Sequence, residues 1–367
     1  MFHGANRRMF SVAAIDPEPK RRTAAIPSLD GWRAVAVLLV VLGHAKLIQG
    51  DLAFFGVTVF FFLSGYLITT LMMREVAETG TVHLGRFWLR RFLRLTPPLV
   101  VTVLLAYAGA AMGWIAGGTG AWGFASLLGY FHNYYVLAVQ SGDSVPLGLG
   151  VYWSLAVEQH FYLVLPLLFL LFHDRERPAK MARIVAGLCA VVLLWRGWLT
   201  FGSNVDFARV YFATDTRIDS ILFGCLLALW KNPMVPTFAQ GFALVKDRWI
   251  LASGAVLILS FLVRWIPFRQ SFQFTLQGLA LMPLFLLSMR HPTSRWFAWL
   301  NHRWMKRIGD LSYTIYLVHC VVLFNLESRL PGRIALLAVS AMTIFVYAWC
   351  MERFVESPLR SLRRRLG

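Results

Sequence analysis

Long runs of apolar residues alternate with short polar or basic stretches along most of the chain. A transmembrane helix needs about 17–25 predominantly apolar residues, and ten runs reach that length. The pattern therefore predicts an all-α fold, a polytopic bundle of transmembrane helices. The ten predicted spans are residues 32–49, 53–73, 95–115, 152–172, 184–201, 210–230, 249–266, 272–289, 308–326 and 334–352.

One further segment, residues 122–139, is apolar at both ends but holds Gly129, His132 and Asn133 at its centre. Irregular backbone at membrane depth has to be buried in protein or line a cavity. We therefore expect this segment to be half-inserted or re-entrant, without crossing the bilayer.

The distribution of basic residues favours ten spans. Cytoplasmic loops of membrane proteins carry an excess of Lys and Arg, and this chain has 36 such residues. With ten spans, 28 of them fall on the side of the N-terminus and eight on the other; with residues 122–139 as an eleventh span, 18 fall on each side. We therefore expect ten crossings of the inner (cytoplasmic) membrane, with both termini cytoplasmic. The predicted parts are a basic cytoplasmic tail (1–28), a membrane domain (29–358) and a basic C-terminal tail (359–367).

Composition restricts the class of protein further. The chain is 58% hydrophobic, with a mean hydropathy of +0.60 and a net charge of +18. Disordered chains are far less hydrophobic, and nucleic-acid-binding modules carry such charge on a polar surface, so no nucleic-acid partner is expected. The four cysteines form no Cys-x-x-Cys pair. We expect them to be small buried side chains, and we predict no metal site.

Ionisable residues inside the predicted spans form two layers. Such residues are costly in a bilayer and usually mark function. The first layer lies at the cytoplasmic edge, and two interpretations are open for it. Arginines bind phosphates through paired hydrogen bonds, but basic residues also anchor helices at this edge. The layer consists of Arg33, Arg90, Arg91, Arg94, Arg307 and Asp310.

The second layer is expected in the outer half of the bilayer, where four predicted spans contribute to it. A single intramembrane histidine is often structural, but the convergence of four helices favours a functional site. For Arg217 and Asp219, mutual neutralisation is an open alternative. The layer consists of His44, Glu158, His160, Arg217, Asp219 and His319.

The first predicted span connects the two layers. Arg33 and His44 are eleven residues apart, which on an α-helix is close to three full turns and a rise of about 16 Å. Both side chains therefore project from one face. A long ligand with a phosphate head and a slender reactive tail fits this spacing, and acyl-coenzyme A has that shape.

The first three spans resemble those of the membrane acyltransferase-3 family. Residues 29–44 hold an Arg and a His separated by ten residues. Residues 56–68 are similar to the second-helix motif of the family, with Tyr66 where Phe is usual. Residues 91–94, followed by Pro97, are similar to its Arg-x-x-Arg element.

Later segments extend the resemblance, so that it runs in order from residue 29 to about 358. Residues 153–162 match the Trp-Ser-Leu-x-x-Glu block of the family, with Gln159-His160 in place of the common Glu-Gln. Residues 217–219 and 312–319 also resemble family elements. Each motif is weak alone, and together they are highly specific.

The resemblance implies an integral membrane O-acyltransferase, in most cases an O-acetyltransferase. Such proteins move an acyl group from cytoplasmic acetyl-CoA or another acyl-CoA to a carbohydrate on the far side of the membrane. The expected acceptor is therefore a glycan: an exopolysaccharide, a lipopolysaccharide or a lipid-linked sugar. Many members carry a fused extracytoplasmic hydrolase-like domain, and this chain is expected to be a stand-alone form. Further expected partners are the lipid bilayer, a second copy of the chain or polysaccharide-assembly proteins.

The resemblance and the chemistry of acyl transfer together assign roles. His44 is the expected general base, and Glu158 is expected to orient its imidazole or share its proton. Ser64 either packs near the acyl tail or makes a close helix contact. The CoA phosphates are expected to bind Arg33, Arg91 and Arg94, and the acceptor to bind Arg217, Asp219 and His319.

Alternatives stay open at this point. The acceptor is a small molecule or macrolide in some members of the family. A transporter also has intramembrane charges and re-entrant segments, although this chain has no internal repeat. An inactive scaffold protein with retained motifs is a further alternative, and direct transfer and a covalent acyl-enzyme are both compatible with the sequence.

Overall fold

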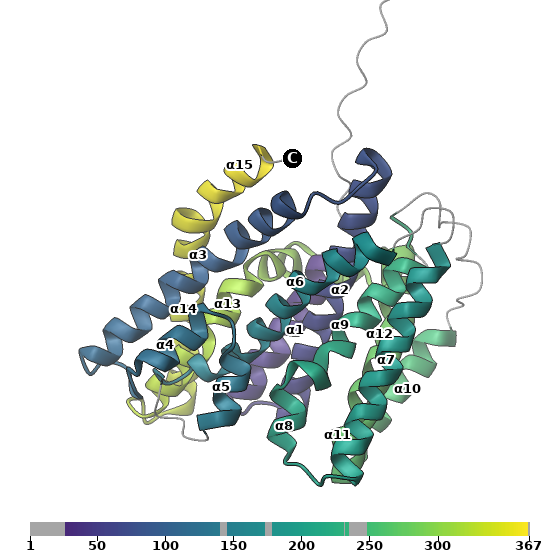
Figure 1. The fold of residues 1–367 in the computed structure, drawn as a ribbon. Coiled ribbons are helices and arrows are strands. Elements are labelled where there is room, and N and C mark those ends of the chain that lie inside the picture. The colour runs from purple at the N-terminus through teal and green to yellow at the C-terminus, as the bar shows by residue number, and fades with distance from the viewer. Residues whose placement is uncertain (1–25, 140–144, 173–177, 231, 235–247, 366–367) are drawn as a thin grey trace, which may run out of the picture.

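Each of the ten predicted spans corresponds to a helix in the computed structural model, which describes residues 26–139, 145–172, 178–230, 232–234 and 248–365. Within these ranges the chain forms helices and no β-strand, which confirms the all-α expectation (Figure 1). The ten helices are α1 (Leu29–His44), α2 (Gly50–Thr79), α3 (Leu84–Ala111), α6 (Trp153–Phe172), α7 (Pro178–Phe201), α9 (Thr214–Trp230), α10 (Arg248–Leu262), α12 (Gln273–Arg290), α13 (Arg303–Glu327) and α14 (Arg333–Met351).

Six helices of the described residues are long and apolar enough to cross a membrane. The protein is therefore a multi-pass helical membrane protein. α1, α9 and α10 have 16, 17 and 15 residues and fall short of this length, so the count of ten crossings stays a prediction. The six helical stretches are Gly50–Thr79, Leu84–Ala111, Leu149–Phe172, Ala179–Phe201, Arg303–Glu327 and Arg333–Leu362.

Residues 122–139 form two short helices, α4 (Ala121–Leu128) and α5 (His132–Val139). Between them Tyr130 has a positive φ of 56°, which ends one helix before the next begins. Each helix has eight residues and is about 12 Å long, well short of the roughly 30 Å hydrocarbon core. The segment is therefore not one spanning helix, as expected, and the side chains of His132 and Asn133 are buried inside the protein.

The remaining elements are short and lie at the ends of the bundle. α4, α5, α8 (Phe207–Phe212) and α11 (Ile266–Ser271) gather at one end. At the other end, the start of α3 lies near α15 (Ser357–Arg365), which follows a π-helical turn (Glu352–Glu356) (Figure 1). Two 3₁₀ turns, Leu149–Tyr152 and Ala298–Asn301, precede α6 and α13.

The innermost helices approach each other through glycines. A Cβ atom on Gly224 of α9 would lie 2.0 Å from the carbonyl oxygen of Phe62 in α2, and one on Gly65 would lie 1.9 Å from that of Ile221. Gly309 of α13 meets the backbone of Asp30 in α1 in the same way. Small residues allow such close helix packing in membranes. α1, α2, α9 and α13 therefore form a tightly packed centre.

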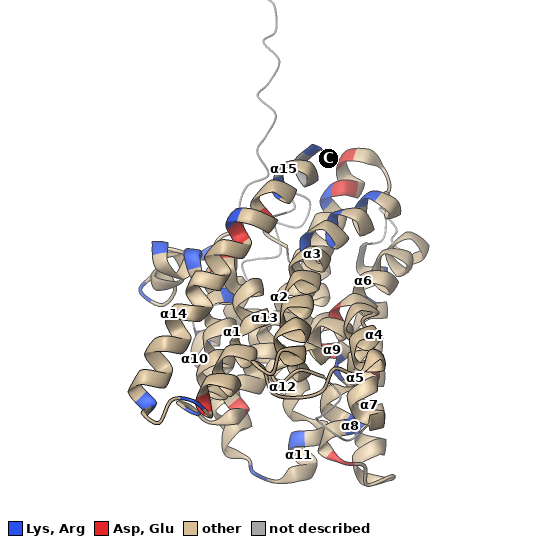
Figure 2. Cartoon of the chain, turned by 90° about the vertical axis from the view of Figure 1, so that its left-hand side faces the viewer, with Lys and Arg blue, Asp and Glu red and all other residues tan. Residues whose placement is uncertain are grey.

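Charged residues mark the two ends of the bundle. Figure 2 shows Lys and Arg on α15 and at the start of α3, at one end of the molecule, and little charge along the middle. This arrangement agrees with a protein embedded in a bilayer. Of the predicted terminal tails, residues 1–25 and 366–367 lie outside the described residues.

Candidate functional site

Three cavities in the described chain follow one another, two of them along α1, and we name them from the end where α1 begins. The inner cavity, of about 80 Å³, lies near that end, and Arg33, Arg91 and Arg94 line it. Arg33 forms an ion pair with Asp30, at 3.3 Å from Nη1 to Oδ1, and the carboxylate of Glu158 lines the same cavity. The Nε atom of Arg91 is buried and has no hydrogen-bond partner. The three arginines predicted to bind phosphates therefore converge on one space, and with Glu158 as the acidic side chain in its lining this space keeps an excess of positive charge.

Glu158 lies in this inner cavity and not beside His44. One carboxylate oxygen accepts a hydrogen bond from the Ser64 hydroxyl at 2.8 Å, and the other accepts one from Tyr162 at 3.4 Å. Glu158 was expected in the outer layer, together with His44. That expectation assumed that these residues of different helices lie at the same depth in the membrane. Ser64 thus faces the cavity, and the neighbouring Gly65 makes the close helix contact.

The central cavity, of about 320 Å³, contains His44 at the other end of α1. It shares Val57 and Tyr316 with the inner cavity, so these two side chains stand between the two spaces. Arg33 and His44 therefore line consecutive cavities along one helix, in agreement with the predicted spacing.

His319 of α13 is fully buried against His44. Its Nε2 atom lies 3.3 Å from Nδ1 of His44, and its Nδ1 atom lies 2.7 Å from the carbonyl oxygen of Tyr316. A ring nitrogen that faces a carbonyl has to carry the hydrogen, so Nε2 of His319 is an acceptor. Nδ1 of His44 also faces a carbonyl, that of Val40 at 2.9 Å. These contacts leave Nε2 of His44 with the free lone pair.

Cys320 completes a cluster with the two histidines. The potential ligand atoms of His44, His319 and Cys320 all lie within 4.8 Å of one another, which is close enough for one cation. The sequence did not indicate this group. His319 and Cys320 are adjacent on α13, and the third member, His44, lies on another helix far away in the sequence. The backbone hydrogen bonds of both imidazoles account for their orientation without a metal.

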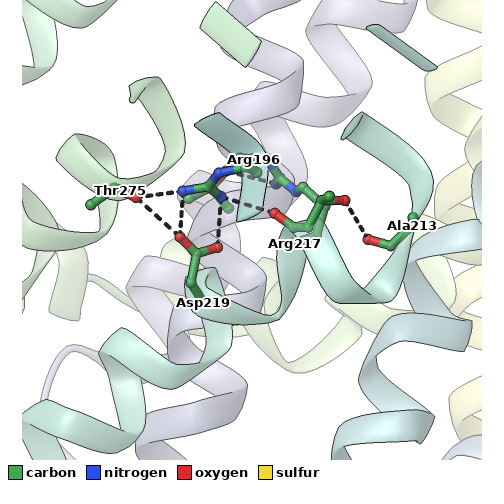
Figure 3. A network of polar contacts seen from close by, with 7 residues as sticks. Arg196, Ala213, Arg217, Asp219 and Thr275 are labelled. Atoms are coloured by element: carbon green, nitrogen blue, oxygen red, sulfur yellow. Dashed lines mark hydrogen bonds and ion pairs between the residues drawn. The ribbon is translucent and has the colours of Figure 1, made fainter. Parts of the chain in front are cut away.

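Asp219 of α9 pairs with Arg196 of α7 and not with Arg217. Two parallel hydrogen bonds of 2.9 and 2.7 Å join the guanidinium of Arg196 to the carboxylate, and both side chains are fully buried (Figure 3). Thr275 of α12 contacts both partners. The alternative that Arg217 and Asp219 neutralise each other is therefore wrong. The carboxylate of Asp219 on α9 accepts hydrogen bonds from Arg196 of α7 and Thr275 of α12, and so it joins three helices.

Arg217 is buried in an aromatic surrounding. Its guanidinium carbon lies 3.7 Å from the ring centre of Phe274 and 5.3 Å from that of Tyr211. It donates one hydrogen bond to Thr58 at 3.1 Å, while Nε and Nη1 have no partner. Cation–π attraction of this kind is stronger where water is excluded. Arg217 lines none of the three cavities.

Other predicted charges are held in local contacts. His160 contacts the hydroxyl of Thr214 at 2.7 Å. At the edge predicted to be cytoplasmic, Arg90 pairs with Glu75 at 2.9 Å and Arg307 with Glu352 at 2.6 Å. These arginines therefore differ from Arg91 and Arg94, for which the described residues provide no acidic partner within ion-pair distance.

The outer cavity is the largest of the three, at about 990 Å³. It lies at the end of the bundle formed by α5 and α8, and it shares Gly150, Val151, Ala208 and Phe212 with the central cavity. Phe324 of its wall also contacts the ring of His44, with ring centres 6.0 Å apart. The three cavities therefore follow one another through the protein, with His44 in the middle.

Sequence reasoning missed several residues of this arrangement. Arg196 was one of the eight basic residues assigned to the outer side. No local pattern connects it with Asp219, which lies 23 residues away on another helix. His132 was visible as a polar residue in an apolar segment, but not as part of a cavity. Tyr316 lies inside a quoted motif, yet its place between two cavities depends on how α13 packs.

The fold and the cavities define a class: a multi-pass helical membrane protein with basic side chains at one end of a series of cavities and a histidine pair at its centre. Comparison with known proteins gives the family. Residues 26–351 match the family model of acyltransferase 3, described as an acyltransferase domain. The chain belongs to this family.

Two relatives indicate the activity found in the family. The chain is 32% identical to the peptidoglycan O-acetyltransferase OatA of Listeria monocytogenes, over 91% of this chain and 56% of the relative. It is 27% identical to the O-acetyltransferase OatA of Staphylococcus aureus strain NCTC 8325, over 91% of this chain and 57% of the relative. The chain thus spans about half the length of these relatives. No solved structure matches it.

Proposed function

We propose that this protein is a membrane O-acyltransferase that moves an acetyl group from acyl-CoA to a hydroxyl of a glycan. The observation that carries this proposal is the series of three cavities, with arginines at one end and His44 in the middle. The named activity of the relatives, O-acetylation, supports the acetyl group and the hydroxyl acceptor. The peptidoglycan acceptor of one relative supports a glycan.

The donor belongs in the inner cavity. Arg33, Arg91 and Arg94 supply the charge and paired donors that phosphates prefer, and Arg91 keeps a buried donor without a partner. Helix anchoring alone does not explain why the three converge on a cavity. Glu158 acts on this donor side, where Ser64 and Tyr162 hold its carboxylate. The arginine end faces the cytoplasm of the inner membrane, and the ten helices cross with both termini there.

The reaction takes place beside His44. The acceptor hydroxyl gives its proton to Nε2 of His44 while its oxygen attacks the thioester carbonyl carbon. The carbon–sulfur bond then breaks, and the CoA sulfur takes the proton from the imidazole. The ester forms, free CoA leaves through the inner cavity, and no further reactant is required. Alignment of both substrates across the central cavity supplies the proximity that such a transfer needs.

His319 positions the base in this scheme. Its acceptor nitrogen and the Val40 carbonyl both face Nδ1 of His44, which holds the imidazole in the tautomer with a free Nε2. Arg217 and Asp219, which the sequence assigned to the acceptor, are enclosed by aromatic rings and by Arg196. We assign them to packing of α7, α9 and α12.

The test uses purified full-length protein in nanodiscs with labelled acetyl-CoA. We expect His44→Ala to lower acetyl-CoA turnover by about 100- to 10,000-fold, because His44 is the histidine that lines the central cavity among the described residues. The matched control is His291→Ala, at an exposed position far from the cavities. Arg91→Ala is expected to raise the apparent KM for acetyl-CoA with little change in kcat. Full turnover in His44→Ala contradicts the proposal.

A further inference from the structure

The outer cavity holds a buried imidazole with an unused acceptor. His132 is 1% exposed, and its Nε2 atom has no hydrogen-bond partner. Its other ring nitrogen, Nδ1, lies 2.8 Å from the Ser126 hydroxyl. That hydroxyl donates its single hydrogen to the carbonyl of Gly123 at 2.7 Å. Nδ1 of His132 is therefore the donor, and Nε2 keeps a lone pair.

A buried acceptor without a partner is costly, and most buried polar groups in proteins are paired. His132 lines the outer cavity, so a ligand there lies against its ring. A lone pair on Nε2 requires a donor from that ligand, such as a hydroxyl. The cavity thus contains a fixed, unpaired acceptor at the end of the route to His44.

The rest of the described cavity wall is largely apolar and includes three aromatic rings. Tyr135 stacks on His132 with ring centres 5.9 Å apart, and Phe212 and Phe324 add two further rings. Among the described residues its charged side chains are Asp206 and Arg209, one of each sign. Arg209 pairs with Asp215 through Nη2 at 2.6 Å, while its buried Nη1 has no partner within the described chain and can donate to a ligand oxygen. The charges of the two lining side chains offset each other, which favours an uncharged ligand with oxygen atoms. The cavity's volume of about 990 Å³ lies within the range of about 300–1,000 Å³ that is typical of ligand-binding pockets.

We propose that the outer cavity binds an uncharged saccharide unit and that His132 Nε2 accepts a hydrogen bond from one of its hydroxyls. The inference rests on the proposed function, since it assigns the acceptor to this cavity. The aromatic rings provide flat apolar faces for the sugar ring. Phe212 lines both the outer and the central cavity, and Phe324 contacts the ring of His44. The bound sugar thus directs another hydroxyl toward the central cavity.

The experiment measures binding and turnover separately on the full-length protein in nanodiscs. The probes are an N-acetylglucosamine tetramer, which is uncharged, and a galacturonate tetramer of similar size, which is an anion. Calorimetry gives their Kd values without acetyl-CoA. A second assay gives acetyl-CoA hydrolysis without an acceptor.

We expect the uncharged tetramer to bind and the anionic tetramer to bind at least tenfold more weakly. His132→Leu removes the acceptor and is expected to raise Kd for the uncharged tetramer about 3- to 10-fold, with acceptor-free hydrolysis unchanged. His132→Gln retains an acceptor oxygen and is expected to restore part of the affinity. The matched control is His160→Leu, since His160 lies near α5 but lines none of the three cavities. We expect wild-type affinity for that variant.

Three results overturn the proposal: equal affinity in His132→Leu and wild type, preferred binding of the anionic tetramer, or no binding of either tetramer. None of them affects turnover in the His44→Ala comparison. Conversely, sugar binding that depends on His132, in a protein without acetyl-CoA turnover, contradicts the proposed function and leaves the outer cavity as a saccharide site.

Discussion

At the scale of single residues, the buried polar groups divide into those that satisfy one another and those that do not. Asp219 and Arg196 satisfy each other through two hydrogen bonds. Arg91 and His132 each keep an unpaired atom at a cavity wall. Arg217 also keeps two unpaired atoms but lines none of the three cavities. Because an unpaired buried group is unfavourable, those at a cavity wall are the candidates for contact with a ligand.

The first prediction concerns His319 as a positioning residue. His319→Ala removes the acceptor beside His44 Nδ1, and we expect kcat to fall about 10- to 100-fold with an unchanged KM for acetyl-CoA. His319→Gln offers an amide oxygen and is expected to recover part of kcat. Steady-state kinetics on both variants make the comparison. Wild-type kcat in His319→Ala contradicts this role.

A second prediction separates structure from catalysis. Asp219→Asn breaks a fully buried ion pair and is expected to lower the free energy of unfolding by about 3–5 kcal/mol, because Arg196 remains buried without its counter-charge. The matched control is Asp215→Asn, whose pair with Arg209 is about one-third exposed, with an expected loss of about 0–1 kcal/mol. Thermal melting in detergent distinguishes them, and equal melting temperatures contradict the assignment.

At the scale of helices, the close contact between α2 and α9 fixes the walls of the inner cavity. Gly224 meets the Phe62 backbone, and the facing Gly65 is next to Ser64 of that cavity. A side chain at Gly224 has to separate two helices that both carry buried residues along their length. The exact depth of Ser64 and Glu158 therefore depends on this contact.

The third prediction follows from this close contact between α2 and α9. Gly224→Ala is expected to destabilise the protein by about 1–3 kcal/mol, because its Cβ has only backbone atoms to displace. Gly197→Ala on α7 is the control, since no atom lies within 4 Å of its added Cβ, and it is expected to leave stability equal or higher. Unfolding measured by fluorescence in detergent gives both values. A Gly224→Ala variant as stable as the control is incompatible with the observed packing.

Elements were easier to predict than contacts. The ten apolar runs each became a helix because a long apolar run has few alternatives, and the break at Tyr130 follows from the polar centre of residues 122–139. The partner of Asp219 and the level of Glu158 were not predictable. Both depend on how far one helix is shifted along another, and no residue of either helix encodes that shift locally.

At the scale of the whole molecule, the uneven distribution of basic residues predicts the orientation in the membrane. The loop after α2 is expected in the cytoplasm and the loop after α13 outside. Six helices meet the length and composition needed to cross. The three shorter ones, α1, α9 and α10, require local thinning of the bilayer or burial against neighbours to do so. Orientation is therefore a property to be measured.

The fourth prediction is such a measurement. In a Cys350→Ser background, Ser328→Cys is expected to react with a membrane-impermeant maleimide in intact cells, whereas Thr81→Cys reacts only after permeabilisation. Both positions are exposed, and the three other native cysteines are buried. Labelling of Thr81→Cys in intact cells reverses the proposed orientation.

Tyr316 lines both the inner and the central cavity, and its hydroxyl lies 2.8 Å from the carbonyl of Val151 and 2.7 Å from the Ser154 hydroxyl. In the proposed reaction the acyl arm of the donor has to pass this ring to reach His44. Two hydrogen bonds hold the ring at the boundary, so its position sets how wide the passage between the two cavities is. The same side chain that orders the wall of each cavity thereby selects for a slender arm.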